Sequence, residues 1–414
     1  MSGPARLSLF GGFGVELEYM IVDAETLSVR PIADELLSVG AGEPGAGDVE
    51  RGEIGWSNEL VAHVVELKVS EPAPSLEPLP ALFQKNVHEI NAILSARGAR
   101  LMPAGMHPWM VPERETRIWP GEYGHVYQAF DRIFGCRGHG WANLQSLHLN
   151  LPFADDAEFA RLHAAIRLVL PILPALTASS PVVEGRVTGL MDNRLEVYRT
   201  NSRKIARVAG QVIPEPAFSR AEYDLQILEP LYAEIAPHDP AGVLRHEWLN
   251  ARGAIARFTR NAIEIRVMDV QECPLVDVAI CAAAVAVLRA LVDERWSSLA
   301  EQQSAAVAPL AEILLATIRD AEQAVIRNRD FLRLFGFPQE SGTANDVWRH
   351  LLSAVPEVTS TESAWHEPLD VILNDGPLAR RIVRALSHDD QSAVYRELCR
   401  CLEVGQAFQP DSAA

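Results

Sequence analysis

The sequence predicts an α+β fold in which helices cover one face of a β-sheet and leave the other face open. Segments that alternate apolar with other residues, typical of strands with one buried face, are separated by long connections in the first two thirds of the chain. From about residue 275 the apolar spacing becomes helical almost to the end. No linker or repeat divides the chain, so we expect one domain, 1–414, with a helical C-terminal part and a flexible tail after about residue 408.

The first predicted strand spans residues 13–23, where an apolar residue recurs at every second position from Val15 to Ile21. Glu16 and Glu18 occupy the alternate positions. Because side chains alternate between the two faces of a strand, both glutamates are expected on the face opposite the apolar stripe.

A Gly-rich acidic segment, residues 40–55, interrupts the pattern and predicts a loop. A second strand is predicted over residues 60–69, with Glu66 and Lys68 sharing its polar face. A helix is then expected from residue 78 to 98, because Pro78 suits a helix start and Gly98 suits a C-terminal cap.

A short strand is expected to run toward Met106. The segment that follows, residues 107–119, is rich in Pro, Trp and charge. This composition favours a long ordered loop over a site, and a plain surface excursion is the alternative.

Two more strands are predicted at residues 144–151 and 263–269, with a helix over residues 155–176 between them. The polar face of the first carries Ser146, His148 and Asn150, and that of the second carries Glu264, Arg266 and Met268. Both polar faces therefore present side chains that can bind ligands.

Composition narrows the class of protein. The formal net charge of -18 disfavours a nucleic-acid partner, because phosphate backbones are bound by clustered Lys and Arg. Five scattered cysteines and no evident leader sequence favour reduced thiols in the cytoplasm. The apolar run 278–288 falls short of the roughly 20 residues of a membrane span, so we predict a buried helix and no membrane.

Four carboxylates are predicted on the polar faces of three strands: Glu16, Glu18, Glu66 and Glu264. Glu59 and His148 are weaker additions to this set. If the strands are neighbours, the like charges raise one another's pKa unless a cation neutralises them. Oxygen ligands of this kind suit Mg²⁺ or Mn²⁺. Taken singly, each glutamate is more simply a solvated strand residue, and His148 a hydrogen-bonded core residue.

Arginines lie close to these acids in the sequence. Arg266 shares a predicted face with Glu264 and could hold a carboxylate or a phosphate with two hydrogen bonds, or pair with Glu264 itself. Arg194, Arg199 and Arg203 could supply further anion contacts or form a solvated helix face. No P-loop follows Gly14, so a nucleotide would be held in another way.

Six short motifs occur in a fixed order: Gly14-Val-Glu-Leu-Glu, Val65-Glu-Leu-Lys, Gly105-Met-His-Pro, Leu147-His-Leu-Asn, Ser179-Ser-Pro and Ile263-Glu-Ile-Arg. Together they resemble the glutamate–cysteine ligase type 2 family, including its carboxylate–amine ligase members, over about residues 12–274. The resemblance implies an antiparallel sheet that forms an open funnel, similar to glutamine synthetase, with helices packed on its outer face.

The resemblance also implies site residues and cofactors. ATP and Mg²⁺ would be bound, with Mn²⁺ as an alternative ion. The implied metal ligands are Glu16, Glu18, Glu66 and Glu264, with His148 and Glu59 as weaker members. Glu264 and Arg266 would be catalytic, and Arg266 would contact the γ-phosphate or the substrate carboxylate. Arg194 and His107 are the other candidate substrate contacts.

The implied reaction joins a carboxylate, by default the γ-carboxylate of glutamate, to an amine through an acyl phosphate. Cysteine is the family's default amine, and glutathione biosynthesis its default process. Ser146 stands where many relatives carry a histidine, and Asn261-Ala262 replaces a common Gly-Thr. A phosphotransferase acting on a carboxylate or guanidino group and a non-catalytic nucleotide-binding regulator are the alternatives. The partners expected are small molecules, and a homo-oligomer is left open.

Overall fold

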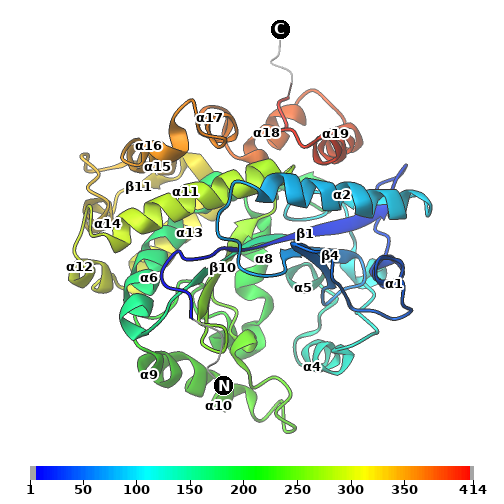
Figure 1. Cartoon of the computed structure of the whole chain (residues 1–414), viewed down its shortest axis with the longest axis horizontal. Helices are drawn as coiled ribbons and strands as arrows, with labels where there is room; N and C mark the ends of the chain where they lie inside the picture. Colours follow the sequence, from blue (N-terminus) through cyan, green and yellow to red (C-terminus); the bar gives the residue numbers. More distant parts are fainter. Residues whose placement is uncertain (1–5, 411–414) are drawn as a thin grey trace.

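A computed structural model describes residues 6–410, and a twisted sheet of eight antiparallel strands forms its centre (Figure 1). The strand order is β2 (Asp48–Val49), β3 (Ile54–Asn58), β4 (Val64–Val69), β1 (Gly14–Asp23), β6 (Ser146–Pro152), β10 (Ala262–Asp269) and β9 (Ala254–Arg257). β5 (Ala99–Met102) pairs with the C-terminal half of β1. The sheet is open, with β2 and β9 at its edges. The predicted α+β fold with an antiparallel sheet is confirmed.

One face of the sheet packs on helices, as the alternation along β1 predicts. Val15, Leu17 and Tyr19 are fully buried in the main hydrophobic core. The same core contains side chains of α2 (Leu79–Ser95), α6 (Asp156–Val169) and α11 (Pro274–Val292). Figure 1 shows α2 and α11 lying along this side of β1. Because residues from both the strand-rich and the helical parts share this core, it supports the proposal that the chain forms one domain.

The opposite face is open over only part of its length, which differs from the expectation. Met20 and Val22 continue the face that carries Glu16 and Glu18, yet both are fully buried. They belong to a second hydrophobic core with residues of α18 (Leu378–Ala385) and α19 (Gln391–Val404). These helices cover Met20 and Val22 because burying apolar residues on both faces of the sheet removes them from water. Only the half with glutamates stays open.

A β-bulge corrects the predicted face of Met268. In the pairing of β10 with β6, Ile265 stands opposite Leu149 and Met268 opposite Leu147, so two residues of β10 face one of β6. Such an insertion shifts the alternation by one residue. Met268 is therefore fully buried in the main core and does not share the polar face of Glu264 and Arg266.

Several element boundaries also differ from the predictions. Residues 60–69 contain a strand only from Val64, and β3 lies within and just after the segment predicted to be a loop. The helix predicted over 155–176 ends at Val169, because Pro171 and Pro174 cannot continue its hydrogen bonding. The helix predicted over 78–98 is confirmed as α2, and Gly98 has the positive φ of 63° expected after a helix end.

The other helices within residues 6–410 are α1 (Ala33–Ala41), α3 (Pro112–Glu115), α4 (Gly124–Phe134), α5 (His139–Ala142), α7 (Pro174–Thr177), α8 (Asn193–Asn201), α9 (Arg220–Tyr223), α10 (Glu229–Ile235), α12 (Leu299–Gln303), α13 (Val307–Asp320), α14 (Arg329–Leu334), α15 (Ala344–Ser353), α16 (Pro356–Thr359) and α17 (His366–Asp375). Short helical turns are η1 (Leu170–Ile172), η2 (Arg203–Val208), η3 (Asp224–Leu228), η4 (Glu247–Leu249) and η5 (Ala321–Gln323). Two-residue strands are β7 (Val182–Val183), β8 (Arg186–Val187), β11 (Val325–Ile326) and β12 (Gly342–Thr343).

The predicted buried helix and the predicted flexible tail correspond to α11 and to the residues after Phe408. α11 is long and apolar enough to cross a membrane by length and composition, but 89% of its most apolar window is buried, which confirms the buried helix. Near the end of the chain, the backbone N–H of Phe408 donates to Glu272 at 2.9 Å. The predicted flexible tail after residue 408 falls mostly on residues 411–414, which lie outside the described residues.

A buried histidine predicts a loss of stability in mild acid. His163 is fully buried among Phe159, Phe218 and Tyr223, and burial lowers its pKa to about 3. In the unfolded chain this histidine binds a proton with a pKa near 6.5, whereas in the folded chain it stays neutral. The free energy of unfolding therefore falls by about 2 kcal/mol between pH 6.5 and 5. Denaturant unfolding at several pH values is expected to show this loss relative to His163→Phe. The same substitution at exposed His388 serves as the control, and equal pH profiles of wild type and His163→Phe would contradict the argument.

Candidate active site

The sheet register gathers the predicted glutamates on one face. β1 and β6 place Glu16 opposite His148, and β1 and β4 place Glu18 opposite Glu66. β10 adds Glu264, which lies opposite Asn150 of β6. Directly opposed residues in antiparallel strands point to the same face. Four neighbouring strands therefore bring together groups that are up to 248 positions apart in the chain, from Glu16 to Glu264.

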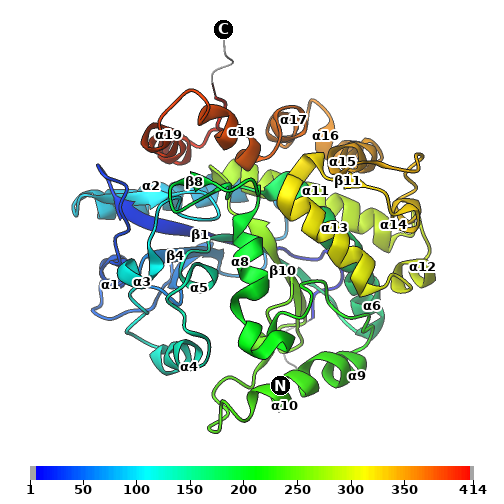
Figure 2. The ribbon, with the colours of Figure 1, turned by 180° about the vertical axis from the view of Figure 1, so that it is seen from behind.

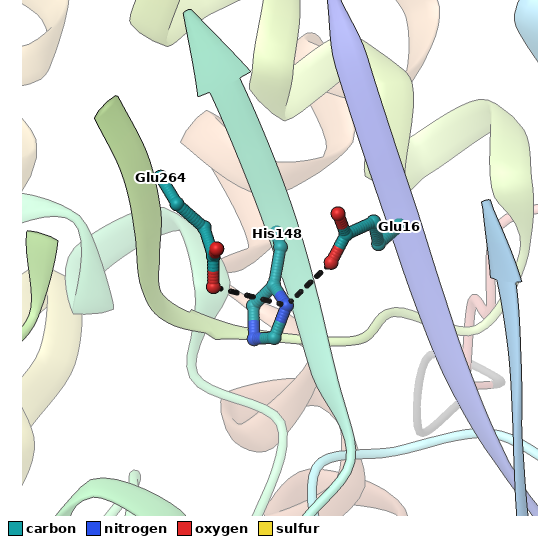
Figure 3. A group of neighbouring side chains, drawn as sticks. All are labelled: Glu16, His148 and Glu264. Atoms are coloured by element: carbon teal, nitrogen blue, oxygen red, sulfur yellow. Dashed lines mark hydrogen bonds and ion pairs between the residues drawn. The ribbon is translucent and has the colours of Figure 1, made fainter. Parts of the chain in front are cut away.

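His148 lies at the centre of this cluster. Figure 3 shows Glu16 and Glu264 on either side of its ring. The Nδ1 atom of His148 is 3.0 Å from Glu16 Oε2 and 3.9 Å from Glu264 Oε1, and its Nε2 atom is 4.0 Å from Glu18 Oε1.

Two sets of ligand atoms meet the spacing of a metal site. Glu16, His148 and Glu264 form one set, and Glu18, Glu66 and His148 form the other, with atoms within 4.8 Å of one another in each. Carboxylate oxygens and one imidazole nitrogen are donors that Mg²⁺ or Mn²⁺ accepts. The residues present therefore fit a divalent cation.

Polar neighbours orient the carboxylates. Ser146 donates to Glu18 Oε2 from its backbone nitrogen at 2.8 Å and from its hydroxyl at 2.9 Å. Ser57 donates to Glu66 Oε2 at 2.6 Å. Asn150 Nδ2 donates to Glu16 Oε1 at 3.0 Å. Sequence reasoning missed Ser57 because no strand was predicted between the loop 40–55 and residue 60, whereas Asn150 lay within one of the six motifs.

Crowding and burial shift the pKa values of these acids. Burial raises the pKa of Glu16, Glu18 and Glu66, and the neighbouring carboxylates raise each further. Glu59 lies beside the cluster, and burial together with Glu18 and Glu66 raises its pKa well above the usual range. A bound cation would offset the same repulsion, because it neutralises the ionised carboxylates.

Glu264 behaves differently because arginines surround it. Burial raises its pKa, but the charges of Arg266, His148 and Arg257 outweigh this and lower the pKa to about 2. Arg266 lies 2.8 Å from Glu264 Oε1, and Arg257 donates to Oε2 at 3.0 Å. Burial lowers the pKa of His148, whereas both arginines carry a full positive charge and do most of the compensation. The predicted ion pair between Arg266 and Glu264 is present in the structure.

The β-bulge and its support position Arg266. Arg194 of α8 is 1% exposed, donates to the backbone oxygen of Arg266 at 2.9 Å and lies 3.4 Å from Asp269. Figure 2 shows α8 in front of β10 in the view from behind. Asp269 in turn accepts from Ser179 at 2.9 Å and Ser180 at 2.7 Å. Gly105 is required here, because a Cβ atom would lie 2.4 Å from Asp269. The motifs that contain Gly105 and Ser179 therefore stabilise the bulge through their contacts with Asp269.

Two cavities meet at the cluster. The polar cavity, of about 720 Å³, is lined by the glutamates of the cluster together with Lys68, Arg257 and Arg260. The aromatic cavity, of about 300 Å³, is lined by aromatic and apolar residues and by Arg194. Four residues line both: Glu18, Glu59, His148 and Arg266. A reaction between ligands in the two cavities would take place beside these shared residues.

His107 lies outside both cavities, which corrects its predicted substrate contact. It is fully buried; its Nδ1 accepts from the backbone of Trp109 at 3.3 Å, and its Nε2 lies 2.8 Å from the Leu27 carbonyl oxygen. Both ring nitrogens are therefore used in holding the backbone.

The loop predicted to lie over a site is ordered but covers neither cavity. None of residues 107–119, all within the described chain, lines them. Trp109 instead packs edge-on against Tyr395 of α19, with ring centroids 5.8 Å apart. Trp109 and Met110 of this loop pack in the second core, whereas Trp119 belongs to the main core. Of the other predicted arginines, Arg199 pairs with Glu196 at 2.6 Å, and Arg203 is exposed.

Solved structures share the fold. A bifunctional glutathione synthetase from Pasteurella multocida superposes with a TM-score of 0.59 at 15% identity, covering 96% of this chain and 52% of that one. A glutamate–cysteine ligase from Francisella tularensis, solved in complex with AMP, superposes with a TM-score of 0.56 at 12% identity, covering 99% and 91%. At these identities the likeness concerns the fold.

Sequence comparisons identify relatives. A protein of Archaeoglobus fulgidus of uncharacterised function is 34% identical, over 84% of this chain and 94% of its own. A protein of Rubrobacter xylanophilus with the provisional name glutamate–cysteine ligase 2-3 is 29% identical, over 45% of this chain and 47% of its own, so this match spans about half of either protein. The model of glutamate-cysteine ligase family 2 matches residues 12–400. The chain therefore belongs to glutamate–cysteine ligase family 2.

Proposed function

We propose that this protein is an ATP-dependent carboxylate–amine ligase that forms a γ-glutamyl amide from glutamate and an amine. The observation that carries the proposal is the cluster of glutamates and His148 at the junction of the polar and the aromatic cavity. Family membership supports ligase chemistry. The cytoplasmic location and the identity of the amine stay predictions.

ATP is assigned to the polar cavity. Lys68, Arg257 and Arg260 line it and suit a polyphosphate. Glu16, Glu18, Glu66, Glu264 and His148 would hold Mg²⁺ or Mn²⁺, with Glu59 beside them. When bound, the cation neutralises the carboxylates and withdraws charge from the phosphoryl group. A volume of about 720 Å³ lies within the range of cofactor pockets.

The residues at the junction would act on the transferring group. An oxygen of the substrate carboxylate attacks the γ-phosphorus of ATP, the bond to the β-phosphate oxygen breaks, and ADP leaves. The ammonium group of the amine first loses a proton; its nitrogen then attacks the acyl carbon, phosphate leaves, and the nitrogen releases a second proton as the amide forms. The charge of Glu264 raises the pKa of Arg266, which stays cationic and can stabilise the transferring phosphoryl group. Glu264 holds the guanidinium in place at 2.8 Å.

The test combines the full chain with ATP, Mg²⁺, a panel of carboxylates that includes glutamate, and a panel of amines. Phosphate and ADP release are measured, and products are identified by mass spectrometry. We expect an amide mass and one ADP for each amide formed. ADP with a phosphorylated product and no amide would instead identify a phosphotransferase. Nucleotide binding without turnover on any pair would contradict the ligase proposal.

A further inference from the structure

We infer that the amine acceptor carries an aromatic group, which binds in the aromatic cavity with its ammonium group toward the glutamates. This inference rests on the proposed ligase function and names its second substrate class. A side chain as small as that of cysteine would leave most of the aromatic wall without a contact.

The wall of the cavity is built from aromatic rings of separate segments. α4 contributes Tyr127 and Phe130, which are three residues apart and so lie on one side of the helix. α5 contributes Trp141, and η4 contributes Trp248. The ring of Phe130 lies 5.4 Å from that of Trp141 and 5.7 Å from that of Trp248, between centroids. Such spacing leaves aromatic faces and edges that favour a further flat ring.

The wall also contains partly exposed apolar side chains, which a small polar substrate would not cover. Trp141, Trp248, Leu60 and Leu144 each keep part of their surface accessible while lining the cavity. Burying this surface under an apolar ligand is favourable by about 25 cal/mol per Å². A volume of about 300 Å³ is sufficient for a single-ring amine but lies at the small end of ligand pockets.

The inner end of the cavity suits an amine. Glu18 and Glu59 line it where it joins the polar cavity. The carboxylate of Glu59, which belongs to neither set of metal-ligand atoms, attracts an ammonium group, and the aromatic faces nearby attract it as well. The described cations of the cavity, Arg194 and Arg266, are already engaged by Asp269 and Glu264. The nitrogen of the amine is therefore placed beside the shared residues, where the acyl phosphate would form.

Two unpartnered polar atoms lie on the side of the cavity formed by α8. The hydroxyl of Tyr198 is buried and has no hydrogen bond of normal geometry to any of residues 6–410, although Arg266 lies near it. The side-chain oxygen of Asn201 is also unpartnered, although its nitrogen donates to Gly140 at 2.7 Å. Buried polar groups are normally satisfied. Because both atoms are buried, a polar substituent on the amine would reach them only after the side chains of Tyr198 and Asn201 turn toward the cavity.

The first experiment compares amines that differ only in the ring. The full chain, with ATP, Mg²⁺ and the carboxylate that supports turnover, is assayed with phenylalanine, alanine and cysteine, and with 2-phenylethylamine and ethylamine. We expect kcat/KM for each aromatic amine to exceed that of its small counterpart by about 10²-fold or more, as for hydrophobic pockets that discriminate by size. Equal or better use of cysteine and alanine, with amide formation intact, would overturn the inference and leave the ligase function standing. Absence of any amide with every pair would overturn both.

Cavity variants test the location. Leu144→Trp fills the cavity. It is therefore expected to raise KM for the aromatic amine, and this rise should be at least tenfold larger than the rise in KM for ATP. Leu315→Trp, at a position 45% exposed on α13, is the matched control and should change neither. Trp248→Ala is the second variant and is expected to shift preference from a phenyl to a naphthyl amine. If both folded variants, checked by circular dichroism, keep wild-type amine preference, the amine binds elsewhere and the inference is wrong.

Discussion

Glu264→Gln is expected to lower amide formation by about 10²- to 10³-fold, the usual cost of removing one group that stabilises a transition state. Its carboxylate lies 2.8 Å from Arg266 and 3.0 Å from Arg257 and belongs to one of the two sets of metal-ligand atoms. A neutral amide keeps the shape but loses the charge that holds both guanidinium groups. The measurement is initial-rate phosphate release with amide detection by mass spectrometry.

The matched control for this variant is Glu196→Gln, which also removes one carboxylate from an arginine pair but lies outside both cavities. It should keep activity within about twofold, since surface substitutions have small effects. Wild-type turnover in Glu264→Gln would contradict both the assignment of Glu264 as a metal ligand and the role of its charge in holding Arg266 for catalysis.

The same variant should also unfold more easily. Glu264 is 4% exposed rather than solvent-facing as its strand position indicated, so the substitution leaves two arginines less compensated. We expect a loss of about 1–3 kcal/mol at pH 7 in denaturant unfolding. Because the folded pKa is lowered to about 2, the stability from Glu264 is present above its unfolded pKa near 4.5 and is lost as pH falls toward 2. The difference between the two proteins should shrink over that window.

The sequence could predict which glutamates share one face of a strand, because side chains alternate between the two faces of a strand. Alternation along β1 places Glu16 and Glu18 together whatever the rest of the chain does. The same rule applies to Glu66 and His148. That these strands are neighbours could not be predicted from the residues alone, because strand order depends on long-range pairing; the family resemblance supplied it.

The features that escaped prediction are those in which one segment depends on another. The bulge at Arg266 depends on a register shift against β6, which no local pattern in β10 reveals. His107 shares the polarity of a ligand, but its ring is used by the backbone of Leu27 and Trp109. The aromatic cavity is assembled from α4, α5 and η4, and each helix alone reads as an ordinary apolar face.

Glu59→Gln is expected to stabilise the metal-free protein while it weakens the effect of Mg²⁺. Burial and the nearby Glu18 and Glu66 raise the pKa of Glu59, so its ionised form is unfavourable in the folded chain at pH 7. A group of this kind contributes stability below its unfolded pKa near 4.5, and the contribution is lost as pH rises through the folded value. Removing the charge should add about 0.5–2 kcal/mol at pH 7.5 in EDTA. Thermal and denaturant unfolding measure this gain.

Adding Mg²⁺ should reverse the order of the two proteins. A cation that binds only the folded state stabilises it by about 2.7 kcal/mol at a concentration 100 times Kd, and wild type offers it the larger negative charge. Exposed Glu77→Gln is the control and should match wild type with and without Mg²⁺. A metal-free Glu59→Gln protein less stable than wild type would show that crowding of carboxylates is not the dominant strain at this site. If Mg²⁺ stabilises Glu59→Gln as much as it stabilises wild type, Glu59 is not a metal ligand. The cation would then be held by the two sets of ligand atoms that share His148.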